Sequence, residues 1–538
     1  MLLDAGVVTR CRHRVHLEHD PAAGYPPAPP DPTGEQRRAD AAAHRRAVAD
    51  RLAVMLGTGW AEVLSDGTDR AAATATLVAT GTPYIWGAAL PPDQRGARRG
   101  HVELLVRVSG GYLPVIVVRH KVTDPGGGAV TSPLSTPTPA GARPDPTRRV
   151  RPQPRDQLRL AHLVRLLRAA GLAPPGRARG GVIGLDADVV LWHDLDAATW
   201  PGGRSALTEY DARFADRLAI ARTALAGRPP LAGPSRVTEC RSCPWWPLCE
   251  PRLRSEHDVS LVLRGEDAVA LRGVGVPTVD ALAALDPDGA PPTPLAGMPF
   301  EDAVLLSRAW LADFTLVRRL PLVEVPRAEV ELDVDMESFG DAGAYLWGSW
   351  LSGADIGLAH GYRAFATWRP LPTPDEARSF AAFWSFLTTV RARSAARGLT
   401  FGAFCYNELA ENRWLLSSAQ RFAGVPGVPA VAAVEEFIVS SAWVDLFGSV
   451  REQFLCAHGK GLKTIAPAAG FSWRDPEANG ENSMRWYRHA VGIDGGVPDP
   501  TQRNRLLTYN EDDVRATLTL RRWMSSPQVM TIPYAGDL

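Results

Sequence analysis

The residues most suited to chemistry are two acids in the segment V-E-L-D-V-D-M-E-S. Asp335 and Glu337 stand two positions apart in a run that alternates apolar and acidic residues. In a β-strand this spacing puts both carboxylates on one face, and Asp333 shares that face one step further out. Carboxylates held side by side repel each other unless a cation or a proton lies between them. The pattern therefore predicts a divalent-cation site, and an edge strand with solvated acids is the alternative.

A second pattern lies near the C-terminus, in L-L-T-Y-N-E-D-D-V-R-A-T-L. Read as a helix, this segment puts Tyr509 and Asp513 on one face, because residues four positions apart are neighbours on a helix surface. Asp512 points elsewhere on the same helix. A strand that carries D-x-E, followed late in the chain by a helix that carries Y-x3-D, is the most specific combination in the sequence.

This combination resembles the DEDD-type exonucleases of the ribonuclease H-like superfamily, most closely the bacterial YprB-type domain. In such enzymes four acids hold two Mg²⁺ or Mn²⁺ ions, and a tyrosine orients the attacking water. The resemblance, over about residues 328–525, implies that Asp335, Glu337 and Asp513 are metal ligands. It implies that Tyr509 positions the water.

The fourth acid is less sharply defined. The family has an N-x3-D motif at the start of a helix, and the best match here is F-C-Y-N-E-L-A-E-N, with Asn407 and Glu411. A glutamate then replaces the family's aspartate and lengthens the arm by one methylene. Asp445, in S-A-W-V-D-L-F, is the rival ligand or a group behind the ligands. For both acids, a place on an exposed helix surface is the alternative.

A loop-rich segment between these motifs contains basic and aromatic residues. Lys460, Lys463 and Arg474 are suited to contact phosphates, and Trp473 or Trp486 to stack on a base. The alternative is a packed insertion with the tryptophans in its core.

Four cysteines form the other chemical pattern. Cys240, Cys243 and Cys249 follow C-x2-C-x5-C spacing, and Cys11 is available far upstream as a fourth ligand. Thiolates are the ligands that zinc and iron–sulfur clusters prefer. Free thiols, or a zinc site that uses Cys11 or a histidine, are the alternatives.

An early cysteine followed, a domain later, by C-x2-C-x5-C resembles the RecB-like and AddB-like nucleases of the PD-(D/E)XK superfamily. The resemblance covers about residues 1–255. It implies a restriction-endonuclease-like fold in which Cys11, Cys240, Cys243 and Cys249 hold a structural [4Fe–4S] cluster.

The catalytic motif of that family is incomplete in this chain. In G-H-V-E-L-L-V-R-V-S-G-G-Y-L-P-V-I-V-V-R-H-K-V, Glu103 matches the first acid and Lys121 the lysine, but Arg119 stands at the second acid. An arginine cannot ligate a cation. The Q-x3-Y motif is matched only by Gln157, because Ala161 replaces the tyrosine and His162 follows it. We therefore interpret Glu103, Lys121 and Gln157 as remnants of a degenerate first active site.

The elements that must position these residues follow from hydrophobic periodicity and turn residues. The expected fold class is α/β, with an N-terminal restriction-endonuclease-like core and a C-terminal ribonuclease H-like mixed sheet flanked by helices. A glycine turn within 271–285 resembles half of a helix–hairpin–helix, and 124–153 is expected to be an irregular loop. Strands are expected over 73–80, 83–90, 101–108, 112–122, 181–195 (as a pair), 328–339, 344–353 and 361–368. Helices are expected over 36–56, 156–170, 208–227 and 301–320.

The chain has 538 residues, with 59 basic and 59 acidic side chains. This length suggests about three domains, which we assign to 1–255, 256–325 (a helical linker) and 326–538. Zero net charge disfavours a general nucleic-acid coat, although basic stretches in the first third leave a local groove open. No apolar run of about 18 residues occurs, so we expect a cytoplasmic protein without a membrane partner.

Together these patterns predict a metal-dependent nuclease that hydrolyses phosphodiester bonds of DNA or RNA. By resemblance it is a 3′→5′ exonuclease in DNA repair, recombination or nucleic-acid processing. The sequence has no G-x4-G-K-[S/T] motif, so unwinding would fall to a separate helicase. The alternative is a catalytically inactive, nucleic-acid-binding scaffold of a repair complex. A redox protein would need a flavin or nicotinamide motif, which we do not find.

Overall fold

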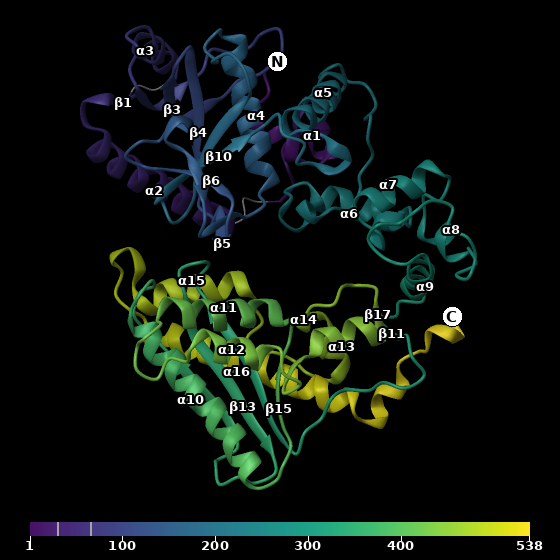
Figure 1. The fold of residues 1–538 in the computed structure, drawn as a ribbon. Coiled ribbons are helices and arrows are strands. Elements are labelled where there is room, and N and C mark those ends of the chain that lie inside the picture. Colours follow the sequence, from purple (N-terminus) through teal and green to yellow (C-terminus); the bar gives the residue numbers. More distant parts are fainter. Residues whose placement is uncertain (29–31, 65–66) are drawn as a thin grey trace. The chain divides into compact units, whose positions relative to one another are not determined.

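A computed structural model describes residues 1–28, 32–64 and 67–538 of the chain (Figure 1). The chain divides into two units, Met1–Ser255 and Glu256–Leu538. Each unit has its own main sheet and its own hydrophobic core. Within the described ranges, no helix combines the length and the apolar character needed to cross a membrane.

The first unit is built on a mixed sheet of eight strands in the order β1-β2-β3-β4-β9-β10-β6-β7. Strands β3 and β4 form the predicted hairpin near its centre, and β4 pairs in parallel with β9. A separate two-stranded sheet joins β5 and β8. The strands of this unit are β1 (Trp60–Glu62), β2 (Tyr84–Ala89), β3 (His101–Val108), β4 (Gly111–Val117), β5 (Thr123–Pro125), β6 (Ala129–Pro133), β7 (Arg143–Asp145), β8 (Arg148–Val150), β9 (Arg179–Ile183) and β10 (Val189–Asp194).

Helices cover both faces of this sheet, because side chains alternate between the faces along each strand. On one face Leu105 and Ile116 share a core with Leu163 of α4. On the other face Leu104 and Val115 share a core with side chains of α2. The helices of this unit are α1 (Arg12–His19), α2 (Pro32–Leu56), α3 (Gly67–Ala79), α4 (Pro154–Ala169), α5 (Ala206–Leu225) and α6 (Trp246–Ser255).

Two local predictions for the first unit are wrong. Residues 73–80, expected as a strand, lie almost entirely in helix α3. The segment A-A-A-T-A-T-L-V-A is rich in alanine, whose helix propensity outweighs the β-preference of its threonines and valine. The region 124–153 is not an irregular loop throughout, since it contains strands β5 to β8. Its Pro and Gly residues mark the turns between short strands whose pairing the composition does not reveal.

The second unit begins with three helices. The predicted glycine turn joins α7 to α8, with Gly275 at a φ of +85°. The helix expected over 301–320 ends at Leu311, and Asp313 then adopts a φ of +56°. The chain next forms β11, which pairs with β17, so the segment predicted as a linker belongs to this unit. These elements are α7 (Glu266–Gly273), α8 (Val279–Ala283), α9 (Phe300–Leu311), β11 (Leu316–Arg318) and β17 (Phe454–Cys456).

A five-stranded mixed sheet in the order β14-β13-β12-β15-β16 forms the core of the second unit. The central strand β12 is antiparallel to β13 and parallel to β15. The three successive strands predicted from residue 328 onward are therefore confirmed. The strands are β12 (Val330–Ser338), β13 (Ala344–Gly353), β14 (Gly361–Ala366), β15 (Phe401–Cys405) and β16 (Trp443–Asp445).

The two faces of β12 have different partners. Its apolar residues, such as Leu332 and Val334, share a core with side chains of α10, α11 and α12, which Figure 1 shows gathered over the sheet. Its acidic residues face α16 instead, where the fully buried Arg521 donates to Asp333 (2.6 Å) and contacts Glu331. The helices are α10 (Asp375–Ala396), α11 (Glu408–Arg421), α12 (Val431–Ile438), α13 (Leu446–Gln453), α14 (Leu462–Ile465), α15 (Gly480–Val491) and α16 (Pro500–Met524).

Candidate metal site and active centre

Three carboxylates meet between strand β12 and helix α16. Asp335 and Glu337 come from the strand and Asp513 from the helix, and one oxygen of each lies within 4.8 Å of the others. Among the residues that the structure describes, this is the only such set of three or more His, Cys, Asp or Glu ligand atoms. Glu337 and Asp513 are each 7% exposed. Buried oxygens this close together have the donor chemistry of a Mg²⁺ or Mn²⁺ site.

The pKa values of the cluster show how strongly these acids repel one another. Burial, followed by repulsion from Asp513, raises the pKa of Glu337 to about 8. Burial and repulsion from Asp513 and Glu337 also raise the pKa of Asp335 well above its usual value. The pKa of Asp513 is raised, mainly by burial. A divalent cation would relieve both the burial cost and the repulsion, so the residues present fit a metal site.

Each carboxylate is oriented by a donor from another element. The side-chain amide of Asn510 donates to Asp335 (2.7 Å), and the indole of Trp473 donates to Asp513 (2.6 Å). The hydroxyl of Ser483, on α15, donates to Glu337 (3.0 Å). These donors fix the side chains without adding positive charge, so the cluster keeps its affinity for cations.

Asn510 is itself held in place by the sheet. The hydroxyl of Tyr362, on β14, donates to its amide oxygen (2.7 Å). Gly348 of β13 pairs with Asp335 across the sheet, and a Cβ at this glycine would lie only 1.7 Å from the same oxygen. Sequence reasoning missed Asn510, Tyr362, Ser483 and Gly348 because only the tertiary packing brings them to the acids.

Lys463 and Tyr509 form a pair beside the acids. The ammonium of Lys463 donates to the Tyr509 hydroxyl (2.9 Å) and lies 4.3 Å from the centre of the phenol ring. Its positive charge also opposes the rise in the pKa values of Asp335, Glu337 and Asp513. Lys463 was expected to contact phosphate, and the structure places it at the acid cluster.

The two rivals for the fourth acid have different surroundings. Glu411, on α11, is 4% exposed, and its Oε2 atom has no partner among the described residues. Burial raises its pKa to about 8, with added repulsion from Asp445 and Glu337. Asp445 instead caps helix α13, where its Oδ1 accepts from the backbone N–H groups of Phe447 (2.9 Å) and Asn407 (2.8 Å). The free, buried oxygen therefore belongs to Glu411.

The remaining residues of the loop-rich segment are mostly engaged within the chain. The Arg474 side chain pairs with Asp512 (2.7 Å) and Glu511 (2.9 Å), so a contact to phosphate would require these pairs to open. Lys460 is half-buried. Trp486 is 2% exposed, and the guanidinium of Arg505 lies 3.9 Å from its ring centre. The prediction that Trp486 stacks on a base is therefore wrong, because the ring belongs to the core.

The four cysteines of the first unit line one small cavity. Cys11, Cys240, Cys243 and Cys249 face it together with Trp245, and all are free thiols. Burial and the neighbouring cysteines raise the pKa of Cys249 to about 12, and burial also raises the pKa of Cys240 and Cys243. The structure thus joins one early and three late cysteines, as the spacing predicted.

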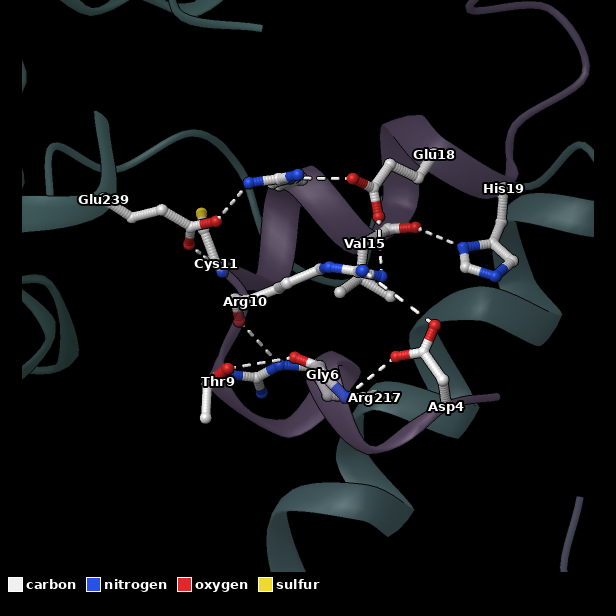
Figure 2. Close-up of polar contacts among 11 residues, drawn as sticks. Asp4, Gly6, Thr9, Arg10, Cys11, Val15, Glu18, His19, Arg217 and Glu239 are labelled. Atoms are coloured by element: carbon white, nitrogen blue, oxygen red, sulfur yellow. Dashed lines mark hydrogen bonds and ion pairs between the residues drawn. The ribbon is translucent and has the colours of Figure 1, made fainter. Parts of the chain in front are cut away.

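A carboxylate holds the early cysteine beside the later ones. Glu239 accepts from the backbone N–H of Cys11 (2.6 Å), a contact drawn in Figure 2. Its other oxygen accepts from Arg14 (2.6 Å), and Arg14 also donates to Glu18 (2.7 Å). The N-terminal segment is therefore attached to the segment just before α6 even without a ligand in the cavity.

The expected remnants of the first active site do not form an acid cluster within the described residues. Glu103 accepts from Arg159 (2.6 Å), and Gln157 accepts from the Trp200 indole (2.9 Å). Arg119 pairs with Asp40 (3.3 Å). Lys121 lies beyond the end of β4 and is half-buried.

His162, which follows the position of the missing tyrosine, is fully buried. It contacts the Tyr210 hydroxyl (2.8 Å) and the Arg99 carbonyl (3.0 Å). Burial lowers its pKa to about 4, so the ring is neutral at physiological pH. These contacts fit a packing role for His162.

Comparison with known proteins supports part of this picture. Residues 428–525 match the family model described as the RNase_H superfamily. The C-terminal unit therefore contains an RNase H-like domain, and the match includes Lys463, Tyr509 and Asp513. None of the curated proteins and none of the solved structures gives a match.

Proposed function

We propose that the second unit is a metal-dependent nuclease whose active centre is the carboxylate cluster of β12 and α16. The observation that carries this proposal is the convergence of three ligand oxygens within 4.8 Å, from residues far apart in the sequence. The RNase H-like match over residues 428–525 supports the same reaction class. The finer assignment, a 3′→5′ exonuclease of DNA or RNA, comes from the resemblance to DEDD-type enzymes.

In this proposal Asp335, Glu337 and Asp513 hold two Mg²⁺ or Mn²⁺ ions, and Glu411 supplies the fourth carboxylate. Bound divalent ions would supply the charge that stabilises the attacking and the leaving oxygen of the phosphodiester. The partnerless oxygen of buried Glu411 and its unfavourable burial support its inclusion. Asp445 is assigned to helix capping because two backbone N–H groups already occupy its Oδ1.

The other groups of the site bind and orient. Burial raises the pKa of the Tyr509 phenol, so the group keeps its proton and can act as a hydrogen-bond donor. Its oxygen also accepts from Lys463, which leaves the phenol fixed next to Asp513. We assign Tyr509 to orienting the attacking water and the Lys463 ammonium to attracting the scissile phosphate. Lys460 and Arg474 are assigned to the strand beyond the scissile bond.

For the first unit we propose a structural [4Fe–4S] cluster held by Cys11, Cys240, Cys243 and Cys249. Thiolates on a single zinc ion, each about 2.3 Å from the metal, would lie roughly 3.8 Å apart. Among the described residues no three of these thiols lie within 4.8 Å of one another, although all line one cavity. The wider spacing supports a multi-iron cluster that joins the N-terminal segment to residues 240–249.

We further propose that the first unit retains a nucleic-acid-binding role without cutting, which is the scaffold alternative applied to one half of the chain. Its Glu103 is paired with Arg159, and no acid cluster forms there among the described residues. A role in repair, recombination or processing, with a separate helicase for unwinding, completes the proposal.

Digestion of end-labelled DNA and RNA, single- and double-stranded, tests the catalytic assignment. The wild-type chain should cut at least one substrate when Mn²⁺ is supplied and not when divalent ions are chelated. Asp335→Asn should abolish cutting, and Glu103→Gln should leave the rate unchanged. Equal loss in the two variants, or no cutting by the wild type on any substrate, would overturn the assignment.

A further inference from the structure

A cavity in the first unit, separate from the cysteine site, is lined mainly by basic side chains. Arg45 and Arg46 reach it from α2, Arg70 from α3, and His101 and Glu103 from β3. None of these arginines belongs to a motif recognised in the sequence. Arg46 is already neutralised by Glu62 (2.5 Å) and Asp50 (2.8 Å), whereas no ion pair within the described residues involves Arg45 or Arg70.

The backbone of the sheet is shaped to hold one of these arginines. Pairing between β2 and β3 is interrupted at Gly87, which adopts a φ of +70°. The Gly87 carbonyl accepts from Nε of Arg70 (2.7 Å), and a Cβ at Gly87 would lie 3.0 Å from the Arg70 Nη2 atom. A side chain at position 87 is disfavoured both by the backbone and by this contact. The guanidinium of Arg70 is thus fixed in orientation at the wall of the cavity.

The charges around the cavity do not balance. Burial lowers the pKa of His101, and the nearby guanidinium groups of Arg159, Arg70 and Arg45 lower it further. Glu103 is the acid of this group, and its Oε1 accepts from Arg159 (2.6 Å). Its Oε2 is buried and has no partner among the described residues. The cavity therefore combines an excess of fixed positive charge with one free acceptor atom.

We propose that this cavity binds a phosphate group of a nucleic-acid strand, with Arg70 and Arg45 as its ligands. Guanidinium groups recognise phosphate through charge-assisted, two-pronged hydrogen bonds, and an anion relieves the repulsion among neighbouring arginines. The free oxygen of Glu103 would accept a hydrogen bond from a sugar hydroxyl or a base N–H of the same strand. The inference rests on the proposed function only in taking nucleic acid as the ligand, since the cavity lies outside the catalytic unit.

Fluorescence anisotropy of a labelled single-stranded oligonucleotide tests the proposal on the full chain without divalent ions. Asp513→Asn is present throughout, so that the strand is not cut. Adding Arg45→Ala and Arg70→Ala together should weaken binding about tenfold or more and lower the salt dependence by roughly 0.7 per lost contact. Arg222→Ala, which removes one exposed charge on α5, should do neither. Thermal melting of each variant establishes that the fold is retained.

Each outcome is informative. Binding by the double variant that equals binding by Arg222→Ala would overturn the proposal. So would arginine-dependent binding of inorganic phosphate without arginine-dependent binding of the oligonucleotide. A loss confined to 5′-phosphorylated oligonucleotides would assign the cavity to a strand end, and a loss for all oligonucleotides to internal phosphates. Failure of Mn²⁺-dependent cutting by the chain that retains Asp513 would count against the catalytic proposal alone.

Discussion

Gly348 and Asn510 approach each other so closely that a single Cβ would separate them. That Cβ would lie 1.7 Å from the Asn510 amide oxygen, and the same amide donates to the metal-site residue Asp335 (2.7 Å). Because Gly348 pairs with Asp335 in the sheet, the glycine creates the space through which α16 reaches the strand. The position of an acid on β12 thus depends on the absence of a side chain on β13.

Replacing this glycine should therefore impair catalysis without unfolding the unit. Gly348→Ala is expected to displace Asn510 and lower the cleavage rate by about 10²-fold, the cost of a small misplacement of reacting groups. Steady-state cleavage and a melting curve measure the two effects. The control is Gly480→Ala, where a Cβ would meet nothing within 4 Å. Full activity in Gly348→Ala would show that Asn510 does not need to hold Asp335.

The stability of the metal-free protein should fall as the pH rises. The pKa of Glu337 is raised to about 8 in the folded state, so the folded chain binds a proton that the unfolded chain releases near its ordinary value of 4.5. This contribution to stability is complete below pH 4.5 and is lost as the pH rises to about 8, at up to roughly 1.4 kcal/mol per pH unit.

Divalent ions should cancel that loss, because they bind the deprotonated acids. Melting temperatures measured from pH 5 to pH 8 with a chelator, and again with Mg²⁺, test the prediction. Asp513→Asn should flatten the pH dependence and remove the response to Mg²⁺. A wild-type curve that is flat in the absence of metal would contradict the repulsion between these acids.

Lys463 should matter for turnover more than for substrate binding. Lys463→Met removes the donor to the Tyr509 hydroxyl and the positive charge beside the acids. We expect kcat to fall by about 10²-fold, with partial recovery in Lys463→Arg. Lys460→Met serves as the comparison, and there only KM should rise. Equal kinetic effects of the two methionine variants would argue that both lysines merely attract the strand.

The cysteine site should hold iron and stabilise the first unit. Anaerobically purified wild-type chain is expected to be brown and to contain iron and sulfide. Cys243→Ser should lose the colour, the iron and thermal stability. Cys405→Ser, a change at a buried cysteine of the other unit, should retain the iron and the colour. Stoichiometric zinc in place of iron would refute the cluster while leaving a metal site.

The buried arginine of α16 should be essential for folding of the second unit. Arg521 is fully buried against Asp333 and Glu331, so Arg521→Met leaves two acids without compensation. We expect a loss of about 3–5 kcal/mol in the free energy of unfolding, measured by denaturant titration. Arg522→Met, at the exposed neighbouring position, should cost little. A small effect at Arg521 would indicate that the acids are protonated in the folded state.

Local periodicity accounts for what the sequence predicted correctly. Strand alternation put Asp335 and Glu337 on one face, and helical spacing put Tyr509 and Asp513 together. The hairpin of β3 and β4 followed from two apolar runs around a glycine turn. The same reasoning misassigned residues 73–80, because an alanine-rich helix that contains threonine and valine looks like a strand when its tertiary partners are unknown.

Contacts between distant segments explain the remainder. Nothing near Gly348 in the sequence indicates that a helix more than 150 residues later must approach it. The pairing of Arg474 with Asp512 and the burial of Trp486 also depend on how α15 and α16 pack. The basic cavity has no motif, because its arginines come from two helices and a strand that only the fold brings together.

Titration of the chain with Mn²⁺, followed by electron paramagnetic resonance of the free ion, tests the shared cation site most directly. The wild type and Glu103→Gln should both bind two Mn²⁺ ions, and Asp335→Asn and Asp513→Asn should each lose most of that binding. If Mn²⁺ binds equally well to all four proteins, the acids of β12 and α16 do not hold the metal.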